Sequence, residues 1–238
     1  MQIGRKLMAR KTYRAPAGQA PPKPLRPVRI VCISDTHELH RELSLPDGDL
    51  LIHAGDFTFF NHASKIHDFN DWLGELPHRH KVVIPGNHDR IFRDDHGFRE
   101  MITNAVLLIN EGVTVCGLKI WGSPVTCDDD AYGYTKRDER ARLYASIPAD
   151  TDIVVTHGPP YGILDREPGS IHRQGCTELR LAVMRLQPRL HIFGHVHSGY
   201  RGRPEQDDDY VAGGMLTPSR VTTHRDPRQP TSFARLWN

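Results

Sequence analysis

Five short polar clusters recur through the middle of the 238-residue sequence, and their residue types are those that bind divalent metal ions. The clusters are Asp35-Thr36-His37, Gly55-Asp56, Gly86-Asn87-His88-Asp89, Thr156-His157 and Gly194-His195-Val196-His197. Carboxylate oxygens and imidazole nitrogens suit borderline ions such as Mn²⁺, Fe²⁺ and Zn²⁺. None of the four cysteines lies in a cluster, which argues against a closed structural zinc site.

The number of candidate ligands indicates two ions rather than one. Seven ligands are too many for one ion but are about right for two ions that share a bridging carboxylate. The pairs Asp35/His37 and His195/His197 are each two positions apart, so on an extended chain both members would face the same side.

Each cluster follows a short apolar run that is typical of a buried strand. The runs cover residues 28–33, 50–54, 81–84, 153–156 and 190–193, and similar runs lie at 105–109 and 113–121. Helical spacing predicts two helices, one around Ile66–Leu76 and one around 179–186, and a third is predicted over 137–147. Strands that alternate with helices predict an α/β fold, in which ligands bind at the carboxyl ends of the strands.

The composition is that of an ordinary globular domain. Apolar residues make up 38% of the chain, charged residues 25%, and the formal net charge is +2. No strong field therefore favours nucleic acid or a membrane as partner, and no apolar run approaches 18 residues. The oligomeric state is not indicated.

The ends of the chain differ from its middle. Residues 1–27 are basic, lack acidic residues and end in a Pro-rich stretch, which predicts a disordered tail before a domain over residues 28–238. A mitochondrial transit peptide is the alternative for this tail. Residues 217–238 carry no pattern that predicts structure, although 210–212 is a candidate short strand.

The cysteines and the remaining histidines are expected to be structural. The cysteines are scattered without close pairing, which indicates a reducing compartment and therefore a cytoplasmic protein. Cys32 and Cys116 lie in apolar runs and are expected to be buried thiols. His53 is expected to be a buried group beside the site. Ordinary surface or loop positions are expected for His62, His67, His78, His80, His96 and His224.

The ordered clusters resemble those of the calcineurin-like metallophosphoesterase superfamily over residues 28 to about 200. The chain is similar in particular to the metallophosphoesterase domain-containing (MPPED) family. The stretches that carry this resemblance are Ser34-Asp35-Thr36-His37, His53-Ala54-Gly55-Asp56-Phe57-Thr58, Thr156-His157-Gly158-Pro159-Pro160, Gly175-Cys176-Thr177-Glu178-Leu179 and His191-Ile192-Phe193-Gly194-His195-Val196-His197. The resemblance implies a two-sheet β-sandwich flanked by helices.

The resemblance also implies a role for each polar residue. The first ion would be held by Asp35, His37 and His197, and the second by Asn87, His157 and His195. Asp56 would bridge the two ions, and a hydroxide between them would attack phosphorus in line. His88 would stabilise the transition state or protonate the leaving oxygen, and Asp89 would orient His88.

The expected activity is hydrolysis of small phosphodiesters such as cyclic nucleotides, with two divalent ions and Mn²⁺ as the expected metal. Tyr132, Tyr134 and Tyr161 are candidates to stack on the base, with a structural role as the favoured interpretation for each. A protein phosphatase is disfavoured, because Gly55-Asp56 is not followed by Asp-Arg-Gly. The other alternative is a scaffold with little or no activity that binds a nucleotide or a protein partner. The presence of every expected ligand argues against it.

Overall fold

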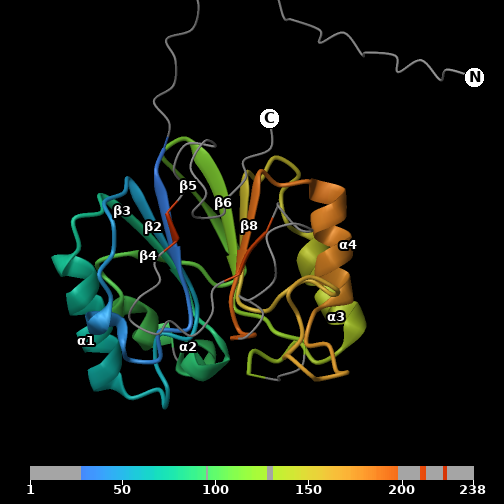
Figure 1. The fold of residues 1–238 in the computed structure, drawn as a ribbon, viewed down its shortest axis with the longest axis horizontal. Coiled ribbons are helices and arrows are strands. Elements are labelled where there is room, and N and C mark those ends of the chain that lie inside the picture. Colours follow the sequence, from blue (N-terminus) through green and yellow to red (C-terminus); the bar gives the residue numbers. More distant parts are fainter. Residues whose placement is uncertain (1–27, 95, 128–130, 198–209, 213–221, 224–238) are drawn as a thin grey trace, which may run out of the picture.

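The computed structural model describes residues 28–94, 96–127, 131–197, 210–212 and 222–223. The predicted tail over 1–27, His224 and most of the segment 217–238 lie outside these residues. Two β-sheets face each other, and helices cover the outer face of each sheet (Figure 1). This is the two-sheet β-sandwich flanked by helices that the family resemblance implies.

The first sheet carries five strands in the order β10-β1-β2-β3-β4. Its strands are β1 (Ile30–Ile33), β2 (Leu50–Ala54), β3 (His80–Ile84), β4 (Val106–Leu107) and β10 (Thr222–Thr223). Strands β1 to β4 are parallel, and β10 pairs with β1 in the antiparallel sense. The carboxyl ends of β1, β2 and β3 therefore lie at one edge, the lower edge in Figure 1.

The second sheet has the order β5-β6-β7-β8-β9. Its strands are β5 (Glu111–Val115), β6 (Leu118–Ser123), β7 (Ile153–Thr156), β8 (Leu190–Phe193) and β9 (Tyr210–Ala212). Strands β6 to β9 are parallel, and β5 forms a hairpin with β6. The carboxyl ends of β7 and β8 reach the same lower edge as those of the first sheet.

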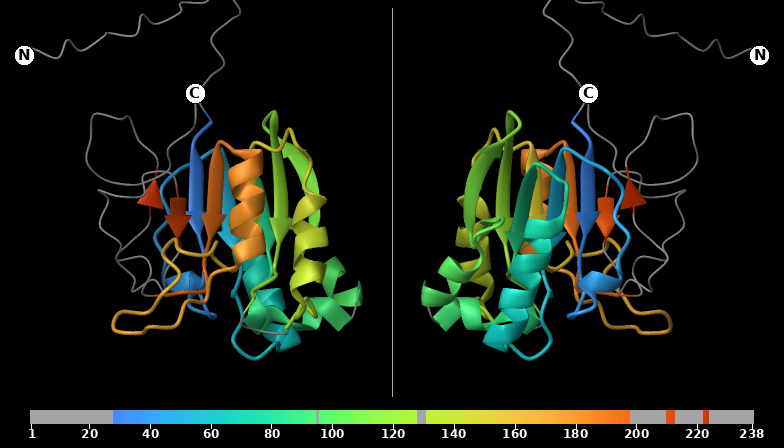
Figure 2. Two further views of the ribbon diagram at one scale, coloured as in Figure 1. Left: turned by 90° about the vertical axis from the view of Figure 1, so that its right-hand side faces the viewer. Right: turned by 90° about the vertical axis from the view of Figure 1, so that its left-hand side faces the viewer.

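Helices pack on the outside of the sandwich (Figure 2). Helix α1 (Ala63–Glu75) covers the first sheet, and α3 (Arg137–Ala145) and α4 (Thr177–Leu186) cover the second. Short turns of helix are α2 (Ile91–Asp94) and the 3-10 segments His40–Glu42, Asn87–Asp89 and His96–Met101. Within the described part of the chain, no helix has the length and apolarity to cross a membrane.

Side chains alternate between the two faces of each strand, and this divides the core into three layers. Alternate residues of the two sheets, such as Ile52 and Val155, meet in the central layer between the sheets. The intervening residues face outward: Leu51 packs with Phe69 of α1, and Val154 packs with Leu179 of α4. The central layer joins the two sheets, so both sets of strand ends are held at fixed positions relative to each other.

Several local expectations are wrong. The predicted single strand over 113–121 is a hairpin, because Cys116 (φ 54°) and Gly117 (φ 76°) adopt left-handed conformations and reverse the chain. Cys116 is therefore an exposed turn residue, whereas Cys32 is buried as expected. His78 is buried rather than at the surface, and its Nε2 lies 3.0 Å from the carbonyl oxygen of Pro46. Thr222–Thr223 forms a strand where no structure was expected.

The burial of His191 predicts that the folded protein loses stability in acid. It lies on β8, its Nε2 is 2.9 Å from Thr156 Oγ1, and burial lowers its pKa to about 3. The unfolded chain, with a histidine pKa of about 6.5, then binds more protons between these two values. The free energy of unfolding should therefore fall as the pH falls from about 6.5 towards 3, by up to about 1.4 kcal/mol per pH unit from this residue.

Urea unfolding of the chelator-treated protein between pH 5 and 7 measures this slope. His191→Gln is expected to reduce the slope by up to one proton, with the largest effect near pH 5, and His67→Gln, at an exposed position on α1, is the matched control variant. An unaltered slope in His191→Gln would contradict the assignment.

Candidate metal centre

The seven candidate ligands converge at the lower edge of the sandwich. The first sheet supplies Asp35 and His37 after β1, Asp56 after β2 and Asn87 after β3, and the second sheet supplies His157 after β7 and His195 and His197 after β8. Residues that are up to 160 positions apart in the sequence come into direct contact there. The structure thus brings together the whole set that the sequence singles out.

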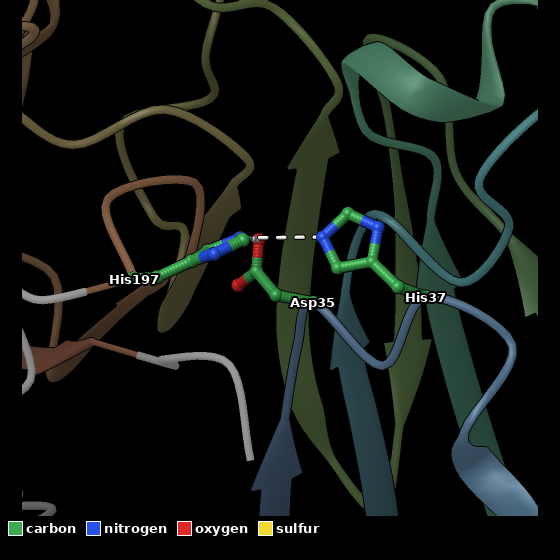
Figure 3. A group of neighbouring side chains, drawn as sticks. All are labelled: Asp35, His37 and His197. Atoms are coloured by element: carbon green, nitrogen blue, oxygen red, sulfur yellow. Dashed lines mark hydrogen bonds and ion pairs between the residues drawn. The ribbon is translucent and has the colours of Figure 1, made fainter. Parts of the chain in front are cut away.

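The first group consists of Asp35, His37 and His197 (Figure 3). Their ligand atoms all lie within 4.8 Å of one another. His37 Nε2 is 3.2 Å from His197 Nε2, which in turn is 3.5 Å from Asp35 Oδ1. Figure 3 shows the two rings approaching from opposite sides with the Asp35 carboxylate between them.

The second group consists of Asp56, Asn87, His157 and His195. The Asn87 Oδ1 atom is 3.0 Å from His157 Nε2 and 3.0 Å from His195 Nδ1. His157 Nε2 also lies 3.1 Å from Asp56 Oδ2. The ligand atoms of Asp56, His157 and His195 lie within 4.8 Å of one another.

Asp56 links the two groups. Its Oδ2 contacts His157 of the second group, and the same oxygen is 3.9 Å from His37 Nε2 of the first. Asp56 also belongs to a third set, with His37 and His88, whose ligand atoms lie within 4.8 Å of one another. Its position between the groups is the one that a bridging carboxylate requires.

The spacing of these atoms fits shared cations. Ligand atoms about 2.1 Å from one ion are separated by about 3.0 Å at right angles and about 3.4 Å at tetrahedral angles. The contacts of 3.0–3.2 Å among His37, His197, Asn87, His157 and His195 fall in this range. The His37–His197 contact pairs two ring nitrogens, and both of them are possible metal ligands.

The electrostatics of the site also favour positive charge. Burial alone would lower the pKa of His157, but the adjacent Asp56 carboxylate raises it to about 10. Burial would raise the pKa of Asp56, yet His157 holds it well below its usual range. A hydrogen bond with Asp35 raises the pKa of His197. Without a cation, the negative charge of the carboxylates therefore keeps protons on the histidines. Bound cations would balance this charge instead.

A backbone contact fixes which nitrogen of His157 faces the centre. His157 Nδ1 is 2.8 Å from the carbonyl oxygen of Ala54. A carbonyl can only accept, so Nδ1 must donate its proton there, and a neutral ring then presents the lone pair of Nε2 to Asp56 and Asn87. This is the tautomer that a metal ligand needs.

The loops that carry the ligands have an unusual backbone. Four of the seven ligands adopt positive φ: Asp35 at 53°, His37 at 41°, Asp56 at 57° and His195 at 72°. Such conformations cost about 1–3 kcal/mol each and persist only where the surroundings impose them. Here the loops after β1 and β2 are joined by Asp35 N–H to Gly55 O (2.8 Å) and His37 N–H to Asp56 O (3.0 Å).

Gly86 makes room for the second group. Its φ of −120° is ordinary extended backbone, so the residue is not needed for a turn. A Cβ at this position would instead collide with the side chain of Asp56 and approach the His157 ring to 2.7 Å. By contrast, Gly55 has φ 97°, a conformation that other residues rarely adopt.

His88 and Asp89 differ in exposure and in their hydrogen-bond partners. His88 is half-buried, and its Nδ1 lies 3.2 Å from the carbonyl oxygen of Phe59, so Nδ1 donates and Nε2 remains available. The Asp89 carboxylate accepts from the backbone N–H groups of Gly86, Phe57 and Thr58 and from the Thr58 hydroxyl. The contacts of Asp89 thus reach the His88 ring indirectly, through the backbone of the loop after β2. Asp89 holds the 57–58 backbone, and the next residue, Phe59, positions His88.

Most of the contacts that support the candidate ligands have no signal in the sequence. His53 is buried as expected, and it receives the Gly55 N–H on Nδ1 (3.2 Å), so its Nε2–H donates to Thr36 Oγ1 (3.0 Å). It therefore links the loop that carries Asp35 and His37 to the loop that carries Asp56. Thr58 acts in a similar way through Asp89, but nothing in a lone threonine or a backbone carbonyl predicts such a role.

The tyrosines expected to contact substrate fall into two classes. Tyr132 is buried, and its hydroxyl donates to the carbonyl oxygen of Asp89 (2.8 Å), so it has the structural role that the sequence analysis favours over stacking. Tyr134 is half-buried, and its hydroxyl accepts from Asn110 (3.4 Å). Tyr161 is exposed and lies under the guanidinium of Arg173, which is 5.4 Å from the ring centre.

Comparison with known proteins agrees with this geometry. The sequence profile of the calcineurin-like phosphoesterase family matches residues 28–199. Metallophosphoesterase domain-containing protein 1 of Homo sapiens is 38% identical over 223 residues, which cover 82% of this chain and 68% of the human protein. A UPF0046 protein of Caenorhabditis elegans is 37% identical over 225 residues, covering 84% of this chain and 79% of that protein.

Solved structures show the same fold at much lower identity. The protein TT1561 of Thermus thermophilus superimposes with a TM-score of 0.57 and 15% identity, covering 83% of this chain and 98% of that one. The family profile spans most of the chain and includes every candidate ligand. The chain belongs to the calcineurin-like phosphoesterase family and, within it, to the metallophosphoesterase domain-containing group.

Proposed function

We propose that this phosphoesterase is a dinuclear enzyme that hydrolyses small phosphodiesters, with cyclic nucleotides as the natural substrate class and Mn²⁺ as the metal. The observation that carries the proposal is the pair of ligand groups that share Asp56, with His88 beside them. When bound, two ions supply a more acidic water as nucleophile and positive charge for the phosphoryl oxygens.

The side chains of the protein have separate tasks in this reaction. Asp56 holds the two halves of the site together, and the backbone N–H of His88 donates to its Oδ1 (2.9 Å). His157 is kept in one tautomer by Ala54, so its coordinating nitrogen needs no rearrangement. His88 keeps its Nδ1 proton on Phe59, so its Nε2 can carry the proton or positive charge that the leaving oxygen requires.

The exposure of the site and its ligand set together support small diesters, rather than a folded protein, as substrates. His197, His195, Asn87 and His88 are half-buried, whereas Asp35 and Asp56 are buried. The carboxylates thus lie beneath a layer of histidines that solvent reaches. A diester can place its phosphoryl group there while its two ester groups project outward.

A substrate panel tests the proposal. We expect Mn²⁺-dependent hydrolysis of bis-p-nitrophenyl phosphate and measurable hydrolysis of 2′,3′- or 3′,5′-cyclic nucleotides. Phosphomonoesters and phosphopeptides should show lower kcat/KM, because neither presents a second ester group. The comparison of kcat/KM across the three classes decides the matter. A clear preference for a phosphopeptide would overturn the substrate class, and no turnover of any phosphoester would overturn the catalytic proposal.

A further inference from the structure

We propose that Phe59 and Phe60 form an aromatic platform that binds an aryl or nucleobase group of the substrate beside the metal centre. This inference rests on the proposed phosphodiesterase function and assigns the substrate-recognition residues of the same site. The two side chains directly follow Thr58, in the loop after the candidate bridging ligand Asp56.

The Phe59 ring lies against the catalytic side chains. Its centre is 5.1 Å from the ring of His88 and 5.2 Å from the ring of His37. Phe60 extends this surface, with its ring centre 4.6 Å from that of Phe59. The platform therefore begins next to the residue that would protonate the leaving oxygen, so the group it contacts is the ester on that side of phosphorus.

The backbone of Phe59 is fixed although its ring is not buried. Its N–H donates to Glu38 Oε1 (3.2 Å), and its carbonyl accepts from His88 Nδ1 (3.2 Å). The residue before it, Thr58, is held by the buried Asp89. A platform on a rigid loop loses little conformational freedom when it binds a ligand.

The exposure of these rings has no evident folding purpose. Phe59 is 43% exposed and Phe60 is 69% exposed, whereas the preceding Phe57 is completely buried in the core beneath them. Two adjacent exposed aromatic rings at a site of charged and polar ligands mark a surface for an apolar partner. Aromatic groups stack on such rings without needing hydrogen bonds, which suits nucleobases and aryl esters.

Direct measurement of ligand binding tests recognition of the aromatic group independently of turnover. Calorimetry with the Mn²⁺-loaded protein would compare phenylphosphonate with methylphosphonate, which share the phosphonate group and differ in the aromatic ring. We expect the wild type to bind phenylphosphonate more tightly. Phe60→Ala and Phe59→Ala should each weaken phenylphosphonate binding by roughly tenfold, at the lower end of the effect of base–aromatic stacking, with methylphosphonate changed less than about twofold.

Two further variants control for bulk and for exposure. Phe60→Tyr retains the ring and should retain the preference for phenylphosphonate. Met184→Ala removes a 59% exposed apolar side chain on α4 and should not alter either affinity. The platform is wrong if the phenylalanine variants change both ligands equally or neither, or if Phe60→Tyr loses the preference. These outcomes do not depend on turnover, so they remain distinct from a failure of the phosphodiesterase proposal.

Discussion

Asp56→Asn is expected to lower phosphodiesterase turnover by about 10³-fold or more and to reduce the bound metal below two ions per chain. The substitution keeps the shape of the side chain and an acceptor for the His88 N–H, but it removes the negative charge that both ligand groups share. An ion in such a site contributes several kcal/mol of transition-state stabilisation, and about 4 kcal/mol corresponds to 10³-fold in rate. Steady-state kinetics and elemental analysis of the same preparation measure both effects.

Asp152→Asn provides a matched control. Asp152 precedes β7, so it lies at the opposite end of that strand from His157, and its Oδ2 accepts from the Lys119 backbone N–H (2.9 Å). This variant should retain both metal ions and turnover. If Asp56→Asn kept two ions and wild-type turnover, the bridging role would be excluded.

His88→Ala is expected to retain both metal ions but to lower kcat by roughly 10²–10⁴-fold, the usual contribution of a positioned acid or base. The loss should be larger for an alkyl ester than for a p-nitrophenyl ester, because a poorer leaving group depends more on the proton. His67→Ala, at an exposed position on α1, is the control and should behave as wild type. Full turnover of a poor-leaving-group diester by His88→Ala would exclude the proton-donor role.

The sequence predicts which side chains converge, because each candidate ligand follows an apolar strand. The strands ending at Ala54, Thr156 and Phe193 have the predicted limits, and parallel pairing then forces the following residues to one edge. Residue type and order at strand ends thus contain enough information to predict that these polar side chains meet. The hairpin at Cys116 escaped prediction because its turn depends on a positive φ at a residue that also suits a strand.

The supporting contacts could not be predicted, because they join residues that share no local pattern. The carboxylate of Asp89 bonds to the backbone of Phe57 and Thr58, more than 30 residues earlier, and Ala54 fixes His157 through a carbonyl that every residue possesses. The sequence leaves Tyr132 as a candidate substrate contact, because an aromatic residue in a loop carries no mark of burial. For the same reason, the sequence does not show that the rings of Phe59 and Phe60 are exposed. It shows only that these residues follow Gly55-Asp56 where a protein phosphatase would have Asp-Arg-Gly.

Metal content of the wild-type protein tests the central claim most directly. The protein would be stripped with chelator, reconstituted with excess Mn²⁺, freed of unbound metal and analysed for elements per chain. Seven ligands arranged around a shared Asp56 predict about two Mn²⁺ ions per chain. A content near zero after reconstitution would contradict the two-metal account.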